Sequence, residues 1–429
     1  MTGKTCLLLA GLTLLTSSGL NPALAENTNS EQQRNSVYHS TNCNVVFASS
    51  TSDLATQLVG LYSPDCGESG CSEGCDSGNR GLCGSQIGDA WKLDKKEDGI
   101  DFGGWWQQGY TSGSTGMFNN IPHKFNTNQA WFYVEKVADG SKGLDVGFRA
   151  DIMYGIDSGD TQAFGNNVGE WDFINGWDFG GTYGWAMPQL YAEVASGDLS
   201  VKIGHFYTLL GYEVVTAPDN FFYSHSLTMY NSEAFTHTGA LATYDAGNDV
   251  TIYGGWTLGW DTGFDQFDGG SNFLGGFSIP LGDKATYTYI TTFGNMGVRG
   301  NGYAHSNVVD VALTDKLNWV LQSDMVQLKI FGGVNNEVGI NNFLLYSVNE
   351  KLGLGARVEW WKSDAGFNHG GQSLPGSGSH SYYAATFGAN IKPHPNVTIR
   401  PEWRYDWFPA SLNGGYEQGI FAVDMILTY

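Results

Sequence analysis

The stretch from Val397 to Trp407, V-T-I-R-P-E-W-R-Y-D-W, decides the fold class. Every second residue is apolar or aromatic, and this face ends in Trp403, Tyr405 and Trp407. The residues between them form a row of four charges, Arg400, Glu402, Arg404 and Asp406. Successive side chains of a strand point to opposite faces. A transmembrane barrel suits both faces, because the aromatic one meets lipid and the charged one lines a wet lumen.

Two other segments repeat this arrangement. Lys351 to Lys362 sets Arg357 and Glu359 against an apolar face, and Asp145 to Tyr154 does so with Arg149 and Asp151. The last segment, Gly419 to Tyr429, alternates likewise and ends on an aromatic residue. That ending is typical either of an ordinary final strand or of the signal that outer-membrane barrel assembly machinery reads.

Alternating segments continue from Ile100 to the C-terminus, separated by Gly, Asn, Asp and Ser. Membrane strands with their connections take roughly 20 residues each, which predicts about 16 strands, with a range of about 12–18. The fold class is therefore all-β, a closed antiparallel transmembrane β-barrel. We expect these strands: Ile100–Tyr110, Asn128–Ala138, Asp145–Tyr154, Pro188–Ala195, Leu199–Tyr207, His237–Asp245, Val250–Trp260, Asn272–Ile279, Lys284–Phe293, Ser306–Leu313, Leu317–Val326, Ile340–Val348, Lys351–Lys362, Tyr382–Ile391, Val397–Trp407 and Gly419–Tyr429.

Composition supports this class. The chain has 429 residues, of which 60 are Gly and only 15% are charged, and 14% are aromatic. A net charge of -22 removes the attraction that nucleic-acid binding needs. No segment after the N-terminus has the 18 or more consecutive apolar residues of a transmembrane helix. We expect the aromatic residues to form girdles at the membrane interfaces and not a large core.

The N-terminal quarter differs from the rest. Residues 1–25 are predicted to be a cleaved signal peptide, with Lys4, the apolar run Leu7 to Leu15 and Ala23-Leu24-Ala25. Residues 26–98 are a Cys-rich periplasmic leader or plug, and 99–429 form the barrel. Disulfides are the default in an exported chain, although four thiolates could also hold a metal. The candidate cysteines are Cys43, Cys66, Cys71, Cys75 and Cys83.

Short segments of the barrel region recur in a recognisable order: Gly104–Tyr110, Asn128–Glu135, Gly147–Asp151, Tyr154–Asp157, Pro188–Glu193, Lys202–Phe206, Pro218–Ser226, His237–Gly239, Gly355–Trp360 and Arg400–Asp406. In these segments the chain resembles the OmpL-like β-barrel porin family of bacterial outer membranes, over about three quarters of its length. The resemblance implies a barrel pore for small hydrophilic solutes.

Charges on the predicted inner face are the first candidate site. They form either a transverse field that filters solutes at a constriction or mutual ion pairs that fix the strand register. These residues are Arg149, Asp151, Lys202, Arg357, Glu359, Arg400, Glu402, Arg404 and Asp406.

The connection Leu209 to Thr236 is the second candidate site. Long structureless connections are usually functional or disordered. This one is rich in aromatic residues, so we predict a loop that folds into the lumen and narrows it. An extracellular lid is the alternative. Its candidate residues are Asn220, Phe221, Phe222, Tyr223 and His225.

Catalytic and metal-binding motifs are missing from the sequence. It has no G-x-S-x-G, H-E-x-x-H or P-loop pattern. Ser224 and Ser226 with nearby histidines leave a phospholipase-like outer-membrane enzyme as one alternative, and a secreted glycan-binding β-sandwich is another. The acidic loops Asp157–Asp172 and Asp261–Asp268 lack the spacing of an EF-hand. We expect neither a metal nor a cofactor.

The sequence thus predicts a non-enzymatic outer-membrane porin. Its water-filled channel would pass small hydrophilic solutes or ions by diffusion. The expected partners are outer-membrane lipids, the solutes themselves and the barrel assembly machinery through Tyr429. A homo-oligomer is left open, and no nucleic acid is expected.

Overall fold

A computed structural model describes residues 89–93, 99–176, 182–265, 269–330, 333–364, 368–369, 372–373, 379–409 and 414–429. The predicted signal peptide lies outside these residues, as does most of the leader with its five candidate cysteines, Cys43, Cys66, Cys71, Cys75 and Cys83. Among the helices of the described residues, none is long and apolar enough to cross a membrane.

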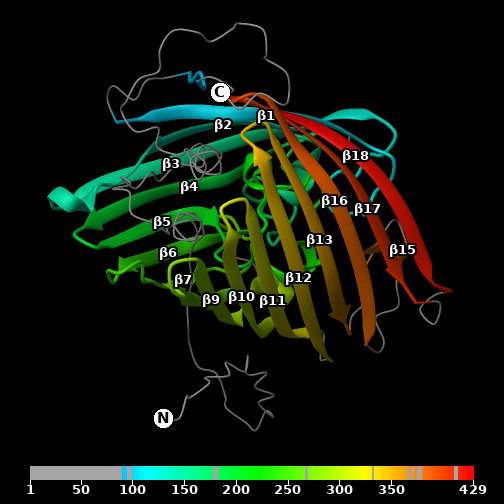
Figure 1. Ribbon diagram of the computed structural model, residues 1–429. Helices are drawn as coiled ribbons and strands as arrows, with labels where there is room; N and C mark the ends of the chain where they lie inside the picture. Colours follow the sequence, from blue (N-terminus) through cyan, green and yellow to red (C-terminus); the bar gives the residue numbers. More distant parts are fainter. Residues whose placement is uncertain are drawn as a thin grey trace, which may run out of the picture.

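Sixteen antiparallel strands close into a barrel (Figure 1), which confirms the predicted fold class. In sheet order each strand pairs with its neighbours along the chain, except that β13 pairs with β16 and that β1 pairs with β18, which closes the ring. The barrel strands are β1 (Asp101–Thr111), β2 (Phe125–Lys136), β3 (Asp145–Gly155), β4 (Gly184–Ser196), β5 (Leu199–Tyr207), β6 (Thr236–Asp245), β7 (Thr251–Thr257), β8 (Ser271–Pro280), β9 (Ala285–Asn295), β10 (Asn301–Thr314), β11 (Leu317–Ile330), β12 (Gly333–Asn349), β13 (Leu352–Ser363), β16 (His380–His394), β17 (Val397–Phe408) and β18 (Tyr416–Thr428).

Small elements accompany the barrel. A two-stranded hairpin, β14 (Asn368–His369) with β15 (Gln372–Ser373), lies in the connection between β13 and β16. The short helices are η1 (Gly140–Lys142), η2 (Ile156–Asp160), η3 (Ala217–Asp219), α3 (Leu227–Ser232) and η4 (Gly297–Arg299).

The seam of the barrel joins its first and last strands. β1 pairs with β2 on one side and with β18 on the other, so no strand edge is left open in the ring. Tyr429 extends the seam, because its backbone N–H and carbonyl both bond Gly104 at 3.0 Å. Its hydroxyl also donates to the carbonyl oxygen of Trp131 at 2.8 Å.

Connections at the two ends of the barrel differ in length. Those at one end are tight turns, such as residues 197–198, 315–316 and 395–396, whereas those at the other end include residues 112–124, 156–183 and 208–235. In outer-membrane barrels the short turns are periplasmic and the long loops extracellular. Trp91 lies at the short-turn end, where its backbone exchanges hydrogen bonds of 2.9 and 2.8 Å with the side chain of Asn396.

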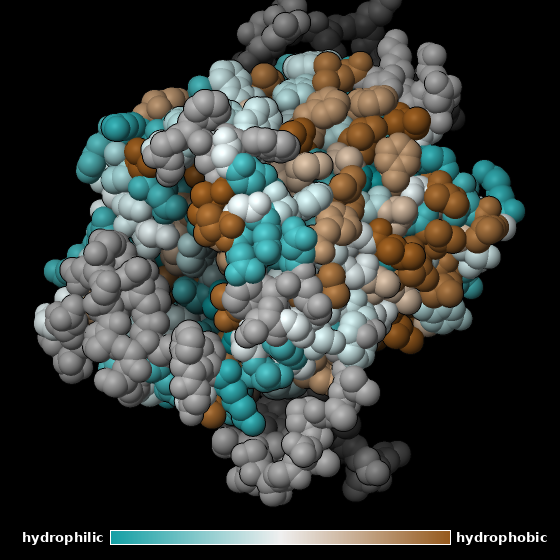
Figure 2. Space-filling model, turned by 180° about the vertical axis from the view of Figure 1, so that it is seen from behind, coloured by the Kyte–Doolittle hydropathy of each residue, from teal (hydrophilic) through white to brown (hydrophobic). Residues whose placement is uncertain are grey.

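The two faces of the wall follow the predicted alternation. On β17 the side chain of Trp403 is 46% exposed, while Arg404 beside it is fully buried. Phe387 and Phe421 on the neighbouring strands are each 50% exposed. Apolar side chains, brown in Figure 2, gather on the outer surface, as a face in contact with lipid requires.

The interior is packed, contrary to the expectation that aromatic residues would be confined to the outer girdles. Trp131, Trp260 and Trp361 are each at most 1% exposed. Four clusters of buried hydrophobic residues lie in the described part of the chain, and each combines residues of the wall with residues of the connection between β5 and β6. This connection supplies apolar side chains that the alternation of the strands alone could not reveal.

Candidate functional site

The connection between β5 and β6, residues 208–235, is called the interior segment here. Its two ends meet, because the Thr208 N–H donates to the carbonyl oxygen of Phe235 at 3.0 Å. Its helix α3 begins where the Ser226 hydroxyl accepts the Met229 N–H at 3.1 Å, an ordinary N-cap. The segment is therefore a folded unit that leaves the wall and returns to the same place.

Wall strands from different arcs of the ring contact this segment. Side chains of β10 and β11 accept its first N–H groups: Gly211 donates to Ser306 at 3.2 Å and Tyr212 to Gln322 at 3.3 Å. From β2, the side chain of Gln129 donates to the carbonyl oxygen of Val215 at 2.8 Å. Contacts with strands so far apart in the ring put the segment inside the barrel, where its green ribbon runs in Figure 1.

The charged row of β17 follows the backbone of the interior segment. Arg400 donates to three carbonyl oxygens, those of residues 217, 220 and 222, at 2.9, 2.6 and 3.1 Å. Glu402 accepts the N–H groups of Tyr223 and Ser224 at 2.9 and 3.2 Å. Arg404 then donates to the carbonyl oxygen of His225. The sign of each side chain thus matches the backbone group that it meets, and charge-assisted bonds are the stronger kind.

A second charged pair, on β13, binds the same segment. Arg357 donates to the carbonyl oxygen of Ser224 at 2.8 Å and forms an ion pair with Glu213. Glu359 accepts the Thr228 N–H at 2.9 Å, at the first turn of α3. A carboxylate beside the N-terminus of a helix is favourable, because the free N–H groups point at it.

Burial distinguishes these charges from those of an open wall. Arg357, Arg400 and Arg404 are 1%, 2% and 0% exposed. Asp406, also predicted as pore-lining, pairs with Arg404 at 2.8 Å. The interior segment therefore covers these charges, and they would influence solutes only by holding the segment in place.

Three of the predicted wall residues belong to a separate group. Arg149 on β3 pairs with Asp151 at 2.7 Å and with Glu135 at 3.4 Å. Lys202 on β5 donates to the hydroxyl of Tyr191 at 3.0 Å and lies over its ring. The structure therefore brings together the predicted charges of β13 and β17 but not those of β3 and β5.

The candidate residues of the loop all belong to the interior segment and play different parts in it. The side chain of Asn220 bonds the backbone of Val214 in both directions, at 2.9 and 2.5 Å, and so closes a tight bend. Tyr223 donates its hydroxyl to Asn128 on β2 at 3.0 Å. His225 donates from Nε2 to the Val214 carbonyl at 2.9 Å. Phe221 and Phe222 pack edge to face, with ring centroids 5.0 Å apart.

Glycines of the wall make room for these side chains. A Cβ atom on Gly109, Gly339 or Gly355 would lie 2.2 to 2.3 Å from Tyr223, Thr228 or Phe221, respectively. Each of these wall positions is on the inner face of its strand. Part of the high glycine content is thus explained by close approach of the interior segment.

Several residues of the site were not predicted from the sequence. Glu213 lies in the predicted loop but was not singled out, and Asp424 faces inward on β18, where it pairs with Arg400 at 2.6 Å. Glu233 accepts from Gln322 at 2.6 Å, and the same amide donates to Asp324 at 2.7 Å. The sequence did contain one indication of Asp424 and Asp324. Each is the acidic residue of an alternating strand, as are the predicted inner-face acids.

Burial perturbs the acids of the interior segment and of its neighbouring loops. It raises the pKa of Glu233 well above the usual range, and the nearby Asp324 carboxyl adds to the effect. Burial likewise raises the pKa of Asp157 to about 7 and that of Asp261 to about 6. For Glu213, burial acts in the same direction, but Arg357 and the bond from Ser226 outweigh it and lower the pKa. The segment therefore holds one carboxyl group whose pKa is lowered, Glu213, and one whose pKa is raised, Glu233.

The serines of the segment do not assemble a catalytic pair with the histidines of β5 and β6. The Ser224 hydroxyl accepts from Arg357 at 3.2 Å, and Ser226 caps α3. His237 bonds Thr208 at 3.0 Å, and His205 bonds Thr238 at 2.9 Å. Among the described residues no group of three metal-ligating side chains is found.

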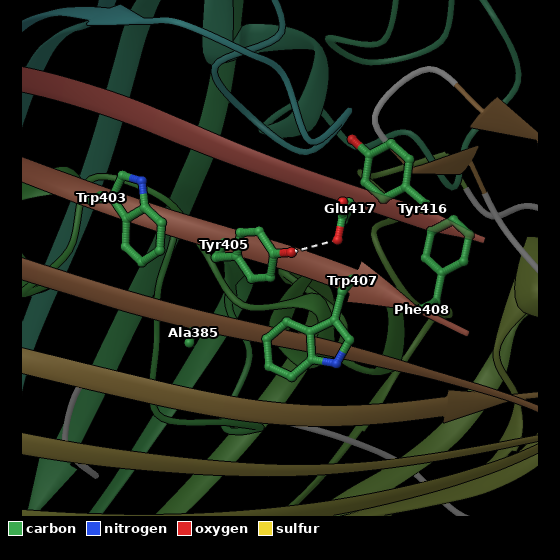
Figure 3. A pocket seen from close by; sticks show the side chains of 7 residues that line it. All are labelled: Ala385, Trp403, Tyr405, Trp407, Phe408, Tyr416 and Glu417. Atoms are coloured by element: carbon green, nitrogen blue, oxygen red, sulfur yellow. Dashed lines mark hydrogen bonds between the residues drawn. The ribbon is translucent and has the colours of Figure 1, made fainter. Parts of the chain in front are cut away.

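A pocket on the outer wall lies apart from this site. Its rings, Trp403, Tyr405 and Trp407, follow β17, and the hydroxyl of Tyr405 donates to Glu417 at 2.7 Å (Figure 3). Ala385 also lines the pocket. Aromatic residues at the end of a barrel strand are typical of an interfacial girdle.

Comparison of the chain with known proteins agrees with the barrel fold. Residues 99–429 match the family model described as "Putative beta-barrel porin-2, OmpL-like". The outer membrane channel DcaP of Acinetobacter baumannii is 9% identical, with a TM-score of 0.51, over 79% of this chain and 100% of the other. OmpT, an outer membrane protein of Vibrio cholerae solved in a trimer form, is 10% identical, with a TM-score of 0.50, over 77% and 99%. Among curated proteins none matches.

Proposed function

This chain belongs to the OmpL-like β-barrel porin family, and from that premise we propose that the interior segment sets the width of its channel. The protein is an outer-membrane channel. Small hydrophilic solutes would cross it by diffusion. The observation that carries the proposal is the set of bonds from β13 and β17 to the backbone of the segment.

The size of the barrel supports a channel with an internal constriction. Sixteen strands enclose a lumen too wide for wall side chains alone to fill, whereas about eight are filled by them. A folded segment of 28 residues would occupy part of that space. The remaining width would then depend on how firmly the segment is held.

A role in catalysis has less support than a role in transport. The hydroxyls of Ser224 and Ser226 are engaged by Arg357 and by the N-terminus of α3, and neither bonds a histidine among the described residues. The predicted wall charges are engaged in holding protein groups. We therefore propose a passive channel without a reaction or a cofactor.

The remaining predictions about location and assembly stay proposals. Residues 1–25 would direct export, and residues 26–98 would form a periplasmic leader, which the contact of Trp91 with the short turn at Asn396 supports. Tyr429 lies at the seam, where assembly machinery would act during closure. A homo-oligomer is supported by the trimer form of the Vibrio cholerae OmpT structure.

The test is removal of the segment. Because Thr208 and Phe235 are hydrogen-bonded neighbours, residues 210–233 can be replaced by a short Gly-Ser linker without opening the wall. We expect a clear rise of single-channel conductance in planar bilayers. A matched variant with residues 365–378 shortened, in the connection between β13 and β16, controls for loop removal as such. An unchanged conductance in a deletion variant that still shows heat-modifiable gel migration would refute the proposal.

A further inference from the structure

The outer faces of β9, β10, β11 and β12 differ from the rest of the wall. Elsewhere the outward residues of mid-strand are apolar, as with Val358 on β13, Phe387 on β16 and Phe421 on β18, each 50% exposed. On these four strands several of the corresponding positions are polar. They are Thr291, His305, Asn307, Ser323 and Asn342, with the hydroxyls of Tyr287, Tyr289 and Tyr303 among them.

Contacts on the inner face establish that these side chains point outward. Ser306 accepts from Gly211 of the interior segment, and Gln322 accepts from Tyr212. Their strand neighbours Asn307 and Ser323 therefore lie on the opposite side of the wall.

The register gathers the polar residues into one patch. His305 lies opposite Thr291, and Asn307 lies opposite both Tyr289 and Ser323. We call this group, with Asn342 on β12, the polar outer patch. It occupies the middle of the strands and not their ends, where polar residues would meet lipid headgroups or water.

Only part of the hydrogen-bonding capacity of the patch is used within the chain. Tyr287 donates to the side-chain oxygen of Asn307 at 2.8 Å. The amide nitrogen of Asn307 donates in turn to the Ser323 carbonyl oxygen at 3.3 Å. The Tyr303 hydroxyl bonds His305 Nδ1 at 2.5 Å, so this contact does not use the second ring nitrogen, Nε2. In the described part of the chain, neither His305 Nε2 nor the Ser323 hydroxyl makes a hydrogen bond. Hydrocarbon offers no partner for such groups, so a lipid contact here is unfavourable.

We propose that the polar outer patch is the centre of an interface with a second copy of this chain. This inference rests on the proposed function for the membrane location of the wall, and it assigns a surface to the homo-oligomer proposed there. Donors such as His305 Nε2–H and acceptors such as the Asn307 amide oxygen occur side by side, so identical patches can satisfy one another. Closed symmetric homo-oligomers are the commonest assemblies of a single chain.

The polar outer patch is smaller than a stable interface, so the interface would include the flanks of the patch. The patch is four strands wide, at about 4.8 Å per strand, and about five residues long, at about 3.3 Å per residue, so its area is roughly 300 Å². A stable interface needs about 800 Å² on each partner. The aliphatic side chains around the patch, Val309, Leu321, Met325 and Ile340, supply surface that either a lipid or a second copy accepts.

Photo-crosslinking in intact outer membranes tests the proposal directly. A benzoylphenylalanine in place of Tyr289 reports on the patch, and the same residue in place of Phe421 is the matched aromatic control on the opposite side of the wall. We expect crosslinks between two copies of the chain from position 289 and none from position 421. Crosslinks from position 289 only to lipid, or only to a different protein, would overturn the proposal.

A second pair of variants separates assembly from transport. Asn307→Leu with Ser323→Leu removes two polar side chains from the centre of the patch, and Val358→Leu changes a lipid-facing position. We expect the first variant to shift from oligomer to monomer on unboiled gels while its barrel remains heat-modifiable, and the second to remain oligomeric. Single-channel conductance of the monomer tests the proposed function independently. An oligomer unaffected by the double substitution would contradict the assigned interface.

Discussion

Arg400 on β17 donates a hydrogen bond of 2.6 Å to the carbonyl oxygen of Asn220, a residue 180 positions away in the interior segment. The same guanidinium pairs with Asp424 on β18 at 2.6 Å. One buried side chain thus joins the last two strands of the wall to a loop from its opposite half.

Replacement of this arginine should loosen the segment. Arg400→Gln loses most of the bonds to three carbonyl oxygens and leaves the Asp424 carboxylate without its cation. Loss of one partner of a buried pair typically costs about 3–5 kcal/mol. We expect higher and noisier single-channel conductance. Arg149→Gln is the control, because Arg149 is equally buried and forms its ion pairs with Asp151 and Glu135 of the wall strands. An equal change in both variants would show that the effect is not specific to the segment.

A glycine of the wall offers a steric test of the same contact. In Gly355→Ala the added Cβ would lie 2.3 Å from the ring of Phe221, so the ring and its contact with the wall must shift. Such overpacking costs about 1–3 kcal/mol. We expect a rise in conductance and a lower temperature of heat modification. Gly254→Ala, where a Cβ would meet nothing within 4 Å, should leave both measurements unchanged.

The wall could be predicted from the sequence, because the face of each residue depends only on the alternation within its own strand. In Val397–Trp407 the period of two assigns each residue to a face without knowledge of any other strand. The interior could not be predicted in this way. A row of Arg and Glu looks the same whether water or a folded loop covers it, and the bonds of Arg400 to Asn220 depend on the register of the whole ring. The burial of Trp131 was likewise not predicted, because alternation alone does not show which aromatic residues meet the segment.

Protonation should favour the packed form of the segment. An acid whose pKa is raised in the packed form binds a proton that a released segment gives up, so packing weakens as pH rises through that pKa. Glu233, Asp157 and Asp261 all have raised pKa values. Burial lowers the pKa of His225 to about 4, which opposes packing only below the ordinary histidine value of about 6.5. Conductance should therefore fall from pH 8 to pH 6.5.

Glu233→Gln isolates one of these acids. Its amide oxygen can still accept from Gln322, and its amide N–H₂ can donate to the Asp324 carboxylate, as a protonated Glu233 would. We expect lower conductance at pH 8 and a shallower pH dependence than in the unmodified channel. Glu417→Gln on the outer wall should retain the original profile. A steeper profile in Glu233→Gln would mean that this carboxyl does not hold the segment.

Ion selectivity should depend on the wall arginines only after the segment is removed. With the segment present, Arg357, Arg400 and Arg404 are at most 2% exposed and their charges face its carbonyl groups and carboxylates. Deletion of residues 210–233 would expose them to the lumen, where cationic side chains favour anions. We therefore expect Arg357→Gln with Arg404→Gln to shift the reversal potential in a KCl gradient strongly toward cations in the deletion background. In the full-length channel the same pair should shift it little. Equal shifts in both backgrounds would place these guanidinium groups on the solute path itself, because solutes would then meet their charges whether or not the segment is present.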